Sequence, residues 1–355
     1  MSPLGLPFQN SAHGLLTWFL DPRSLTLDEE GAHRPAALAS HLAACYRELG
    51  RPASPAGEPV SKTGRPYDRS GYLREDREYR GFVTALMDFV QTRMAPHLTH
   101  FFLHGSLATG DYVKGWSDVD TLMVIRNETA IDGRRLLDLR SLCMASWNLF
   151  LRICPLQHHG YIVAVESELL RYPSHYMPPQ VIDEGLAVLP AQGTVRFHVC
   201  PQEGGALRSL KERRNSLRDA LADGVLRHHP SRGVYLEAHY RNAHEAMSQL
   251  FALLGYVMTV PAFLLDALGS PCYKRDSFAR AKPLFSAQAW GIVERASAVR
   301  QEWGRRESTH YRANAVPQWI PTLLGPDYIE ASHRLLEEAV ALGEKAKPSM
   351  ALAQG

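Results

Sequence analysis

The chain has 355 residues, of which 45% are hydrophobic and 21% are charged, and its formal net charge is +2. This composition is typical of globular proteins and excludes a largely disordered chain, while the length predicts about two domains that each bury a core. The nearly balanced charge argues against a protein that coats nucleic acid through an overall basic surface, although it allows a local basic groove.

The five cysteines are scattered along the chain without a CxxC pair. A scattered, odd-numbered set is typical of reduced thiols in the cytosol and argues against disulfides or a zinc site. The chain does not open with a charged segment followed by an apolar one, and no apolar run is long enough to span a bilayer. We therefore expect a cytoplasmic protein without a membrane partner.

Residues 1–70 are interpreted as an N-terminal extension that is partly helical. Apolar residues at helical spacing predict a helix over 36–49, and the stretch 51–70, rich in Pro, Gly and Ser, predicts an exposed connection. Apolar residues then recur every three or four positions over 79–94, which predicts an amphipathic helix that ends at Pro96.

The most informative stretch begins with an apolar strand predicted over 99–103, which leads into a Gly-Ser turn. After a polar loop, Asp118 and Asp120 open a second apolar strand, and residues two apart in a strand point to the same face. Adjacent carboxylates repel each other unless a cation lies between them, and oxygen ligands beside substrate phosphates suit Mg²⁺. Gly105 lets backbone approach a ligand because it lacks a Cβ atom, and Ser106 adds a hydroxyl and an amide for phosphate oxygens. This layout predicts group transfer from a nucleoside triphosphate.

A Gly-Ser turn, a spacer and an Asp-hydrophobic-Asp strand form the signature of the DNA polymerase beta-like nucleotidyltransferase superfamily. The chain resembles this superfamily because Gly105, Ser106, Asp118, Val119 and Asp120 match the signature position by position. The resemblance implies that Asp118 and Asp120 are catalytic and bind two Mg²⁺ ions. It also implies that Gly105 and Ser106 bind ATP or another nucleoside triphosphate. The alternative is a surface hairpin whose two aspartates only cap a turn.

Two charged residues of the spacer also have a structural and a functional interpretation. Lys114 could contact the triphosphate tail, but a solvated loop lysine is favoured because most lysines are exposed. Asp111 is interpreted as the cap of a turn or helix rather than as a metal ligand.

A covering helix is predicted over 136–151, followed by a short apolar strand over 161–165. In the superfamily that the chain resembles, a third acidic residue stands on such a strand and faces the first two. Here the strand holds no Asp; Glu166 lies at its end, and His158 and His159 lie at its start. Either Glu166 supplies the third carboxylate, or a neutral imidazole faces the site as a proton acceptor, or the histidines are a structural pair at the strand edge.

From residue 196 onward, helical spacing replaces strand-like runs. Helices are predicted over 207–221 and 234–258, and Pro261 is expected to open a short helix over 262–268. The first of these helices carries a row of basic residues, but acidic residues interrupt the row, so a solvated face is favoured over a phosphate-binding one.

The next segment is predicted to be a loop that delivers Lys274. In nucleotidyltransferases of the resembled kind, a helical second domain often supplies a lysine to the triphosphate, which implies Lys274 as a nucleotide-binding residue and Lys282 as the runner-up. An exposed loop lysine is the alternative. Helices near 287–302 and 328–345 complete the predicted bundle, and 346–355 is expected to be a tail.

These observations predict a mixed α/β nucleotidyltransferase core over 71–192, an all-α helical domain over 193–345, and an active site in the cleft between them. We expect a magnesium-dependent enzyme that transfers a nucleoside monophosphate from a nucleoside triphosphate to a hydroxyl of a small molecule or protein and releases pyrophosphate. An aminoglycoside-modifying type of enzyme is a candidate by analogy alone. The alternatives are a catalytically degenerate regulatory module that binds nucleotide, or an enzyme that adds nucleotides to RNA. Nucleic acid is not favoured, because no ordered array of aromatic and basic residues marks a track for it.

Overall fold

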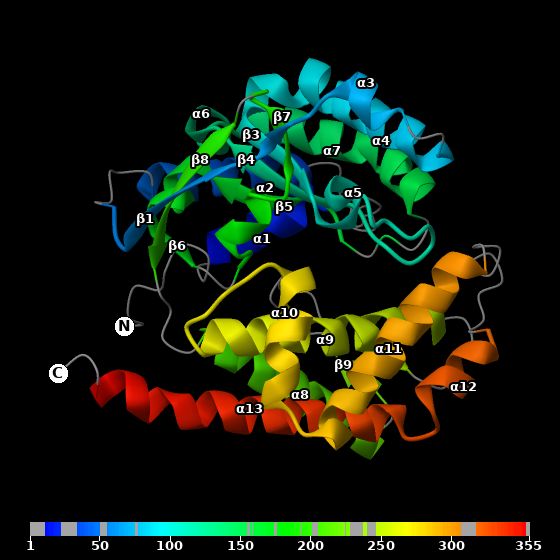
Figure 1. The fold of residues 1–355 in the computed structure, drawn as a ribbon. Helices are drawn as coiled ribbons and strands as arrows, with labels where there is room; N and C mark the ends of the chain where they lie inside the picture. Colours follow the sequence, from blue (N-terminus) through cyan, green and yellow to red (C-terminus); the bar gives the residue numbers. More distant parts are fainter. Residues whose placement is uncertain are drawn as a thin grey trace. The chain divides into compact units, whose positions relative to one another are not determined.

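A computed structural model of the chain describes residues 11–22, 34–49, 55–74, 77–154, 157, 159–173, 176–191, 193–200, 205–223, 225–227, 237–239, 246–306 and 317–352. The chain divides into two compact units, Met1–Pro201 with Ser231–Gly233, and Gln202–Pro230 with Val234–Gly355. Figure 1 shows that strands concentrate in the first unit and helices in the second. This division confirms the predicted fold class of a mixed α/β core followed by a helical region.

A five-stranded sheet forms the centre of the first unit, in the order β2-β7-β3-β4-β5. β3 runs antiparallel to both β7 and β4, whereas β4 and β5 are parallel, and β2 and β7 are parallel. The strand bounds are β2 (Arg65–Pro66), β3 (Leu98–His104), β4 (Asp120–Ile125), β5 (Ile162–Val165) and β7 (Leu186–Leu189). Because β4 and β5 are parallel neighbours, the segments that enter these two strands meet at the same edge of the sheet.

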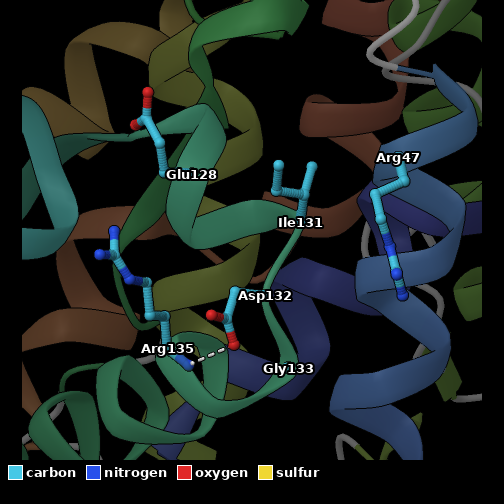
Figure 2. A pocket seen from close by; sticks show the side chains of 6 residues that line it. All are labelled: Arg47, Glu128, Ile131, Asp132, Gly133 and Arg135. Atoms are coloured by element: carbon cyan, nitrogen blue, oxygen red, sulfur yellow. Dashed lines mark hydrogen bonds between the residues drawn. The ribbon is translucent and has the colours of Figure 1, made fainter.

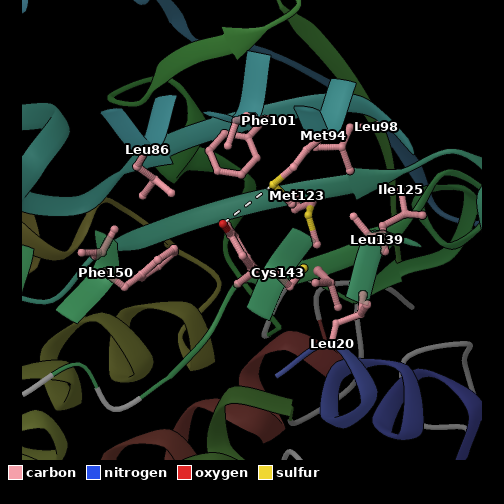
Figure 3. Close-up of a cluster of buried hydrophobic side chains, with 14 of the residues drawn as sticks. Leu20, Leu86, Met94, Leu98, Phe101, Met123, Ile125, Leu139, Cys143 and Phe150 are labelled. Carbon is pink, nitrogen blue, oxygen red and sulfur yellow. Dashed lines mark hydrogen bonds between the residues drawn. The ribbon is translucent and has the colours of Figure 1, made fainter. Parts of the chain in front are cut away.

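Successive residues of the central strands pack into two different hydrophobic clusters. Phe101 and Met123 belong to the cluster on the helical side, whereas their neighbours Phe102 and Leu122 belong to a cluster on the opposite face. The two-residue period of a strand produces this division, and burial on both faces explains why these strands are almost continuously apolar in sequence. Figure 3 shows part of the helical-side cluster, where Phe101 and Met123 lie beside Leu86, Cys143 and other helical side chains.

The longer helices of the first unit supply most of the helical side of this core. They are α1 (Ser11–Leu20), α2 (Arg34–Leu49), α4 (Glu78–Phe89) and α7 (Gly133–Ile153). The amphipathic helix predicted over 79–94 is confirmed in position, but its last part is a π-helical turn, Val90–Met94, and a 3₁₀ turn, Ala95–His97, follows it. Pro96 lies in that 3₁₀ turn, as expected where a helix gives way to a strand.

A three-stranded sheet covers the other face. Its order is β1-β8-β6, with bounds Glu58–Thr63, Thr194–Cys200 and Tyr172–Pro173 respectively. Phe197 of β8 and Tyr172 of β6 pack in the same buried cluster as Phe102. The first structural unit is thus larger than the catalytic domain predicted over 71–192, because β1, β8, α1 and α2 all contribute to its two cores. Its remaining short helices are α3 (Arg69–Tyr72), α5 (Gly105–Thr109), α6 (Asn127–Ala130) and the 3₁₀ segments Glu166–Arg171 and Pro179–Ile182.

The second unit is built from helices that share a buried apolar interior. Leu210, Leu254, Ile292 and Leu336 come from four different helices and are all buried. The helices are α8 (Gly205–Asp223), α9 (Ala246–Ala267), α10 (Lys274–Ala281), α11 (Ala287–Arg305), α12 (Trp319–Leu324) and α13 (Tyr328–Leu352), with a 3₁₀ turn at Lys282–Leu284. Helix α13 therefore continues into the stretch expected to be a tail.

Two local predictions in this unit are wrong. Residues 237–239, expected inside a helix over 234–258, form β10 (Glu237–His239), which pairs antiparallel with β9 (Val225–Arg227). Pro261 does not open a new helix but lies inside α9, where it is buried. A proline inside a helix removes one backbone hydrogen bond, and the burial of α9 against its neighbours compensates for that loss. Within the described residues, no helix combines the length and the apolar character needed to cross a membrane.

Candidate active site

The Gly-Ser turn follows β3 and begins α5, and it packs against Asp120 at the start of β4. Gly105 follows β3 and has φ +66°, and a Cβ atom built on it would lie 2.2 Å from Asp120 Oδ2. The carboxylate of Asp120 thus fills the space that a side chain at position 105 would need. We predicted from sequence that this glycine lets backbone approach a ligand, and the structure adds that it lets backbone approach Asp120. Ser106 is the next residue of α5 and is partly buried.

The loop before Asp118 is ordered by its own hydrogen bonds. The amide of Val113 donates to Ser117 Oγ at 3.0 Å, and the amide of Ser117 donates to the Val113 carbonyl at 2.8 Å. Tyr112 anchors the loop to the end of α7 by donating its hydroxyl to the Ile153 carbonyl at 2.6 Å. Because of these contacts, Asp118 follows a hydrogen-bonded turn and not an extended, solvated loop.

Asp118, Asp120 and His159 form one cluster. His159 Nε2 lies 3.0 Å from Asp118 Oδ2 and 3.5 Å from Asp120 Oδ1. Both carboxylates are about a quarter exposed, with side-chain exposures of 29% and 27%, whereas the His159 side chain is 7% exposed. Asp120 begins β4 and Asp118 lies in the loop just before it, so the two aspartates meet at His159 without both standing on the strand, and both remain accessible to a ligand.

His159 carries the positive charge that balances this pair in the absence of another cation. Burial lowers the pKa of His159, but its hydrogen bonds to Asp118 and Asp120 and their charges outweigh burial and raise the pKa to about 9. The other ring nitrogen, Nδ1, lies 2.8 Å from the Gly160 carbonyl. Because a carbonyl oxygen can only accept, Nδ1 is the donor in that contact.

A second histidine, His104, lies behind the cluster. It ends β3 opposite Asp120 in the strand register and is 6% exposed. Burial lowers the pKa of His104, so its imidazole is neutral at pH 7 despite the nearby charge of Asp120. In the described part of the chain its Nε2 atom has no hydrogen-bond partner.

Gln157 is a residue that the sequence-based reasoning missed. Its Oε1 accepts from the Val119 amide at 2.8 Å, and its Nε2 donates to the carbonyls of Val119 at 3.2 Å and of His159 at 2.8 Å. Gln157 is only 6% exposed. Its side chain connects the backbone of Val119, which lies between the two aspartates, to the backbone of His159. Its position two residues before His159 was the available signal, but a lone glutamine in an irregular segment carries no motif.

Glu166, another candidate for the third ligand, does not join the cluster. Glu166 lies beyond the last residue of β5, at the Ile125 end of β4 and away from Asp120, and it accepts a hydrogen bond from the Asn127 amide at 2.8 Å. The structure contradicts the alternative in which Glu166 supplies the third carboxylate, because parallel pairing places Glu166 at the end of β5 that lies away from the acidic pair. His158 lies outside the described residues.

The two charged spacer residues both have protein partners. Lys114 Nζ lies 2.9 Å from Glu78 Oε2, and Asp111 accepts a hydrogen bond from the Thr109 hydroxyl. These contacts agree with the structural interpretation of both residues.

The basic helix of the second unit also has a structural explanation. In α8, Lys211 pairs with Glu344 at 2.5 Å, and Arg213 donates to Thr259 Oγ1 while its guanidinium lies over the rings of Tyr256 and Phe263. Cation–π contacts of this kind hold an arginine within a helical core instead of presenting it to a phosphate.

Lys274, the predicted phosphate ligand, is the first residue of α10 and is exposed. The prediction that a loop delivers it is wrong, because the helix begins at Lys274 and not at a cap formed by Asp276 or Ser277. Ser277 instead donates its hydroxyl to the Lys274 carbonyl at 2.6 Å. The runner-up Lys282 pairs with Glu294 at 2.7 Å.

A surface pocket of about 540 Å³ is lined by residues of α2, α6 and the start of α7. Figure 2 shows Arg47 from α2 on one side and Glu128, Asp132 and Arg135 on the other. Asp132 already accepts hydrogen bonds from the amides of Arg134 and Arg135, as a helix cap does. This pocket contains none of the clustered residues, so it is separate from the candidate site.

Residues 86–147 match the family model described as a nucleotidyltransferase domain. The chain therefore contains a nucleotidyltransferase domain. The matched segment runs from α4 to α7 and includes the Gly-Ser turn, Asp118 and Asp120, which confirms the resemblance to the DNA polymerase beta-like superfamily. It ends before Gln157 and His159, so these two residues enter the site from outside the matched segment. No curated protein matches the chain.

Proposed function

We propose that this domain transfers a nucleoside monophosphate from a nucleoside triphosphate to a hydroxyl acceptor and releases pyrophosphate. The family match supports a transferase of this general kind. The observation that carries the specific proposal is the convergence of Asp118 and Asp120 beside the Gly105 turn, with both carboxylates partly exposed. Such an arrangement suits a triphosphate whose charge must be neutralised while its phosphorus is attacked.

The cluster has the donors that a divalent cation needs. Ligand atoms of Asp118, Asp120 and His159 all lie within 4.8 Å of one another. A dication bound here would neutralise charge on the triphosphate and on the departing pyrophosphate. The sequence-based expectation of two Mg²⁺ ions enters this proposal as an expectation of divalent cations, whose shared protein ligands would be Asp118 and Asp120.

The chain's own residues then position and stabilise the reactants. Ser106 and the amides after Gly105 hold the terminal phosphates, and Lys274 offsets negative charge on the leaving group. The acceptor oxygen forms a bond to the α-phosphorus, the bond from that phosphorus to the β-phosphate oxygen breaks, and the hydroxyl proton leaves to solvent. Catalysis of this kind depends on orientation and electrostatics more than on covalent participation by the protein.

The proposed acceptor is a small molecule or a protein hydroxyl. The formal net charge of +2 supports this choice over a long nucleic acid. The structural explanation of the basic face of α8 points the same way, because Lys211 and Arg213 already have protein partners.

Pyrophosphate release tests the proposal directly. The protein is incubated with each nucleoside triphosphate, a divalent metal salt and pooled hydroxyl acceptors, and pyrophosphate is measured with an enzyme-coupled assay. We expect turnover with at least one triphosphate, and a loss of about a thousandfold in Asp118→Asn, equivalent to about 4 kcal/mol of transition-state stabilisation. Asp111→Asn is the matched control, since Asp111 belongs to the same loop but contacts Thr109, and it should keep its activity. Equal turnover in wild type and Asp118→Asn would contradict the proposal.

One observation favours a second candidate function, a nucleotide-binding module without chemistry. His159 stands near the place where the superfamily has a third acid, and its raised pKa makes it a positive partner of both aspartates. A protein of this kind would bind a triphosphate in the presence of a divalent metal but release no pyrophosphate with any acceptor. The same assay, combined with nucleotide binding measured by calorimetry, separates the two functions.

A further inference from the structure

The donor set of the candidate site mixes two kinds of ligand. Asp118 and Asp120 offer carboxylate oxygens, whereas His159 offers an imidazole nitrogen within the same 4.8 Å span. Mg²⁺ is a hard cation that takes oxygen ligands in a strict octahedral arrangement. First-row transition metals accept imidazole together with carboxylate, and their affinity for such mixed sites rises from Mn²⁺ onward.

The environment of His159 is the one that ligating histidines have. Nδ1 donates to the Gly160 carbonyl at 2.8 Å, and Nε2 points at the carboxylates of Asp118 and Asp120. A backbone acceptor on one ring nitrogen fixes the ring orientation and directs the other nitrogen at the place where a metal would bind. The Gln157 amide holds the His159 carbonyl at 2.8 Å, which adds a second restraint on the same residue.

A second buried histidine, His104, lies next to this cluster. His104 is 6% exposed, and its Nε2 lacks a hydrogen-bond partner among the described residues. It stands opposite Asp120 on β3. The charges of Asp118, Asp120 and His159 all affect the pKa of His104. A buried polar atom without a protein partner usually has a water or ligand atom as its partner in the working protein.

We propose that the Asp118–Asp120–His159 cluster selects a first-row transition-metal dication, with Mn²⁺ as its representative, over Mg²⁺. The inference rests on the proposed function, in which this cluster holds the divalent cation. When the cation binds, Nε2 coordinates through its lone pair, its proton leaves to solvent, and Nδ1 keeps its hydrogen bond to Gly160. His159 thus determines which metal the site prefers, beyond the role that the two aspartates share with the superfamily.

Metal binding is measured without nucleotide and without turnover. Mn²⁺ binding is followed by electron paramagnetic resonance, and Mg²⁺ affinity is obtained by competition against bound Mn²⁺. We expect the wild type to prefer Mn²⁺, and His159→Asp to shift the ratio of the two affinities toward Mg²⁺ by at least about tenfold, because an oxygen ligand replaces the imidazole. His198→Asp is the control, since this partly buried histidine lies on β8 in the three-stranded sheet, and its ratio should match that of the wild type.

A second measurement needs no variant and remains valid if His159→Asp does not fold. Spin-echo modulation of Mn²⁺ bound to the wild type should show coupling to one imidazole nitrogen. Coupling that is absent, or an affinity ratio that is the same in wild type and a folded His159→Asp variant, would overturn the inference.

The outcome separates this inference from the proposed function. Pyrophosphate release with an unchanged metal preference in His159→Asp would leave the function intact and reject the role of His159. Imidazole-ligated Mn²⁺ in a protein that releases no pyrophosphate would retain the metal site and reject the transfer reaction.

Discussion

Among the described residues of the first unit, two groups bring a histidine to a carboxylate, and these groups differ in exposure. Glu168 accepts hydrogen bonds from the Tyr46 hydroxyl at 2.9 Å and the Val165 amide at 2.8 Å, and lies 3.2 Å from His13 Nδ1. The side chains of His13 and Glu168 are only 4% and 2% exposed. Asp118 and Asp120, by contrast, are about a quarter exposed beside His159.

This difference separates a structural group from a candidate functional one. The lone pairs of Glu168 face donors of the protein itself, and burial together with the charge of Glu168 raises the pKa of Tyr46 well above its usual value, so Tyr46 remains a protonated donor. The carboxylates of Asp118 and Asp120, by contrast, are accessible from solvent and lie with His159 within the 4.8 Å span that a bound cation requires. The same residue types therefore stabilise the fold in one place and are available for ligands in the other.

Neutralising one carboxylate in each group should give the largest effects, and these effects should be opposite: a loss of turnover in one group and a loss of stability in the other. Asp118→Asn should reduce turnover about a thousandfold and change the free energy of unfolding by less than about 1 kcal/mol. Glu168→Gln should lower the free energy of unfolding by about 3 kcal/mol, because the new amide places a donor among the donors of Tyr46, His13 and Val165. Urea denaturation and turnover per folded molecule measure both effects.

The comparison fails if Glu168→Gln reduces turnover of the folded protein as strongly as Asp118→Asn does. An equal loss of unfolding free energy in Asp118→Asn and Glu168→Gln would also contradict the distinction between the two groups.

A substitution at Gly105 should give the next largest effect on activity. In Gly105→Ala the new Cβ would lie 2.2 Å from Asp120 Oδ2, so either the turn or the carboxylate must move. We expect turnover to fall about a hundredfold, since displacing a reacting group by about 1 Å has that order of effect. Steady-state kinetics measured on the folded variant provide the value.

Gly110→Ala is the matched control for this prediction. Gly110 has φ +80°, but a Cβ atom there would meet nothing within 4 Å. It should show the backbone strain of a left-handed residue, about 1–2 kcal/mol in unfolding free energy, without the loss of turnover. Equal kinetic losses in both variants would show that strain, and not contact with Asp120, explains the requirement for glycine.

A smaller effect is expected from Gln157→Leu, which removes the side-chain hydrogen bonds to Val119 and His159. The acidic pair and the imidazole would keep their chemistry but lose a shared restraint, so we expect turnover and metal affinity to fall about tenfold. Gln91→Leu is the control, because Gln91 donates to the Val188 carbonyl, away from the cluster. A variant that loses stability but keeps its metal affinity would assign Gln157 a purely structural role.

The sequence predicted the central strands and the acidic pair because both depend on local patterns. Apolar runs predicted β3 and β4, and the motif predicted that Asp118 and Asp120 lie together, although β4 begins only at Asp120. Gln157 and His159 reach the site through the parallel pairing of β4 with β5, which connects segments far apart in sequence and leaves no local pattern. The same dependence explains why the sequence left Glu166 and the histidines as open alternatives, because the strand direction decides which end of β5 meets Asp120.

Errors in the second unit have a different origin. Pro261 is a strong local signal for a helix boundary, yet α9 continues through it because the surrounding helices bury that stretch. Local propensity predicted where most helices lie, but not where packing extends or divides them.

The smallest predicted effect concerns a residue outside the first unit. If function belonged only to the exposed cluster, Lys274→Ala would leave nucleotide kinetics unchanged. Lys274 is exposed at the start of α10, so its interaction with phosphate is screened by solvent, and we expect the KM for the triphosphate to rise up to about fivefold with little change in kcat. Lys282→Ala is the control, because Lys282 pairs with Glu294 at 2.7 Å and its KM should not change. A rise in KM for Lys282→Ala alone would indicate that Lys282, and not Lys274, contacts the triphosphate. An unchanged KM in both variants would confine the functional residues to the first unit.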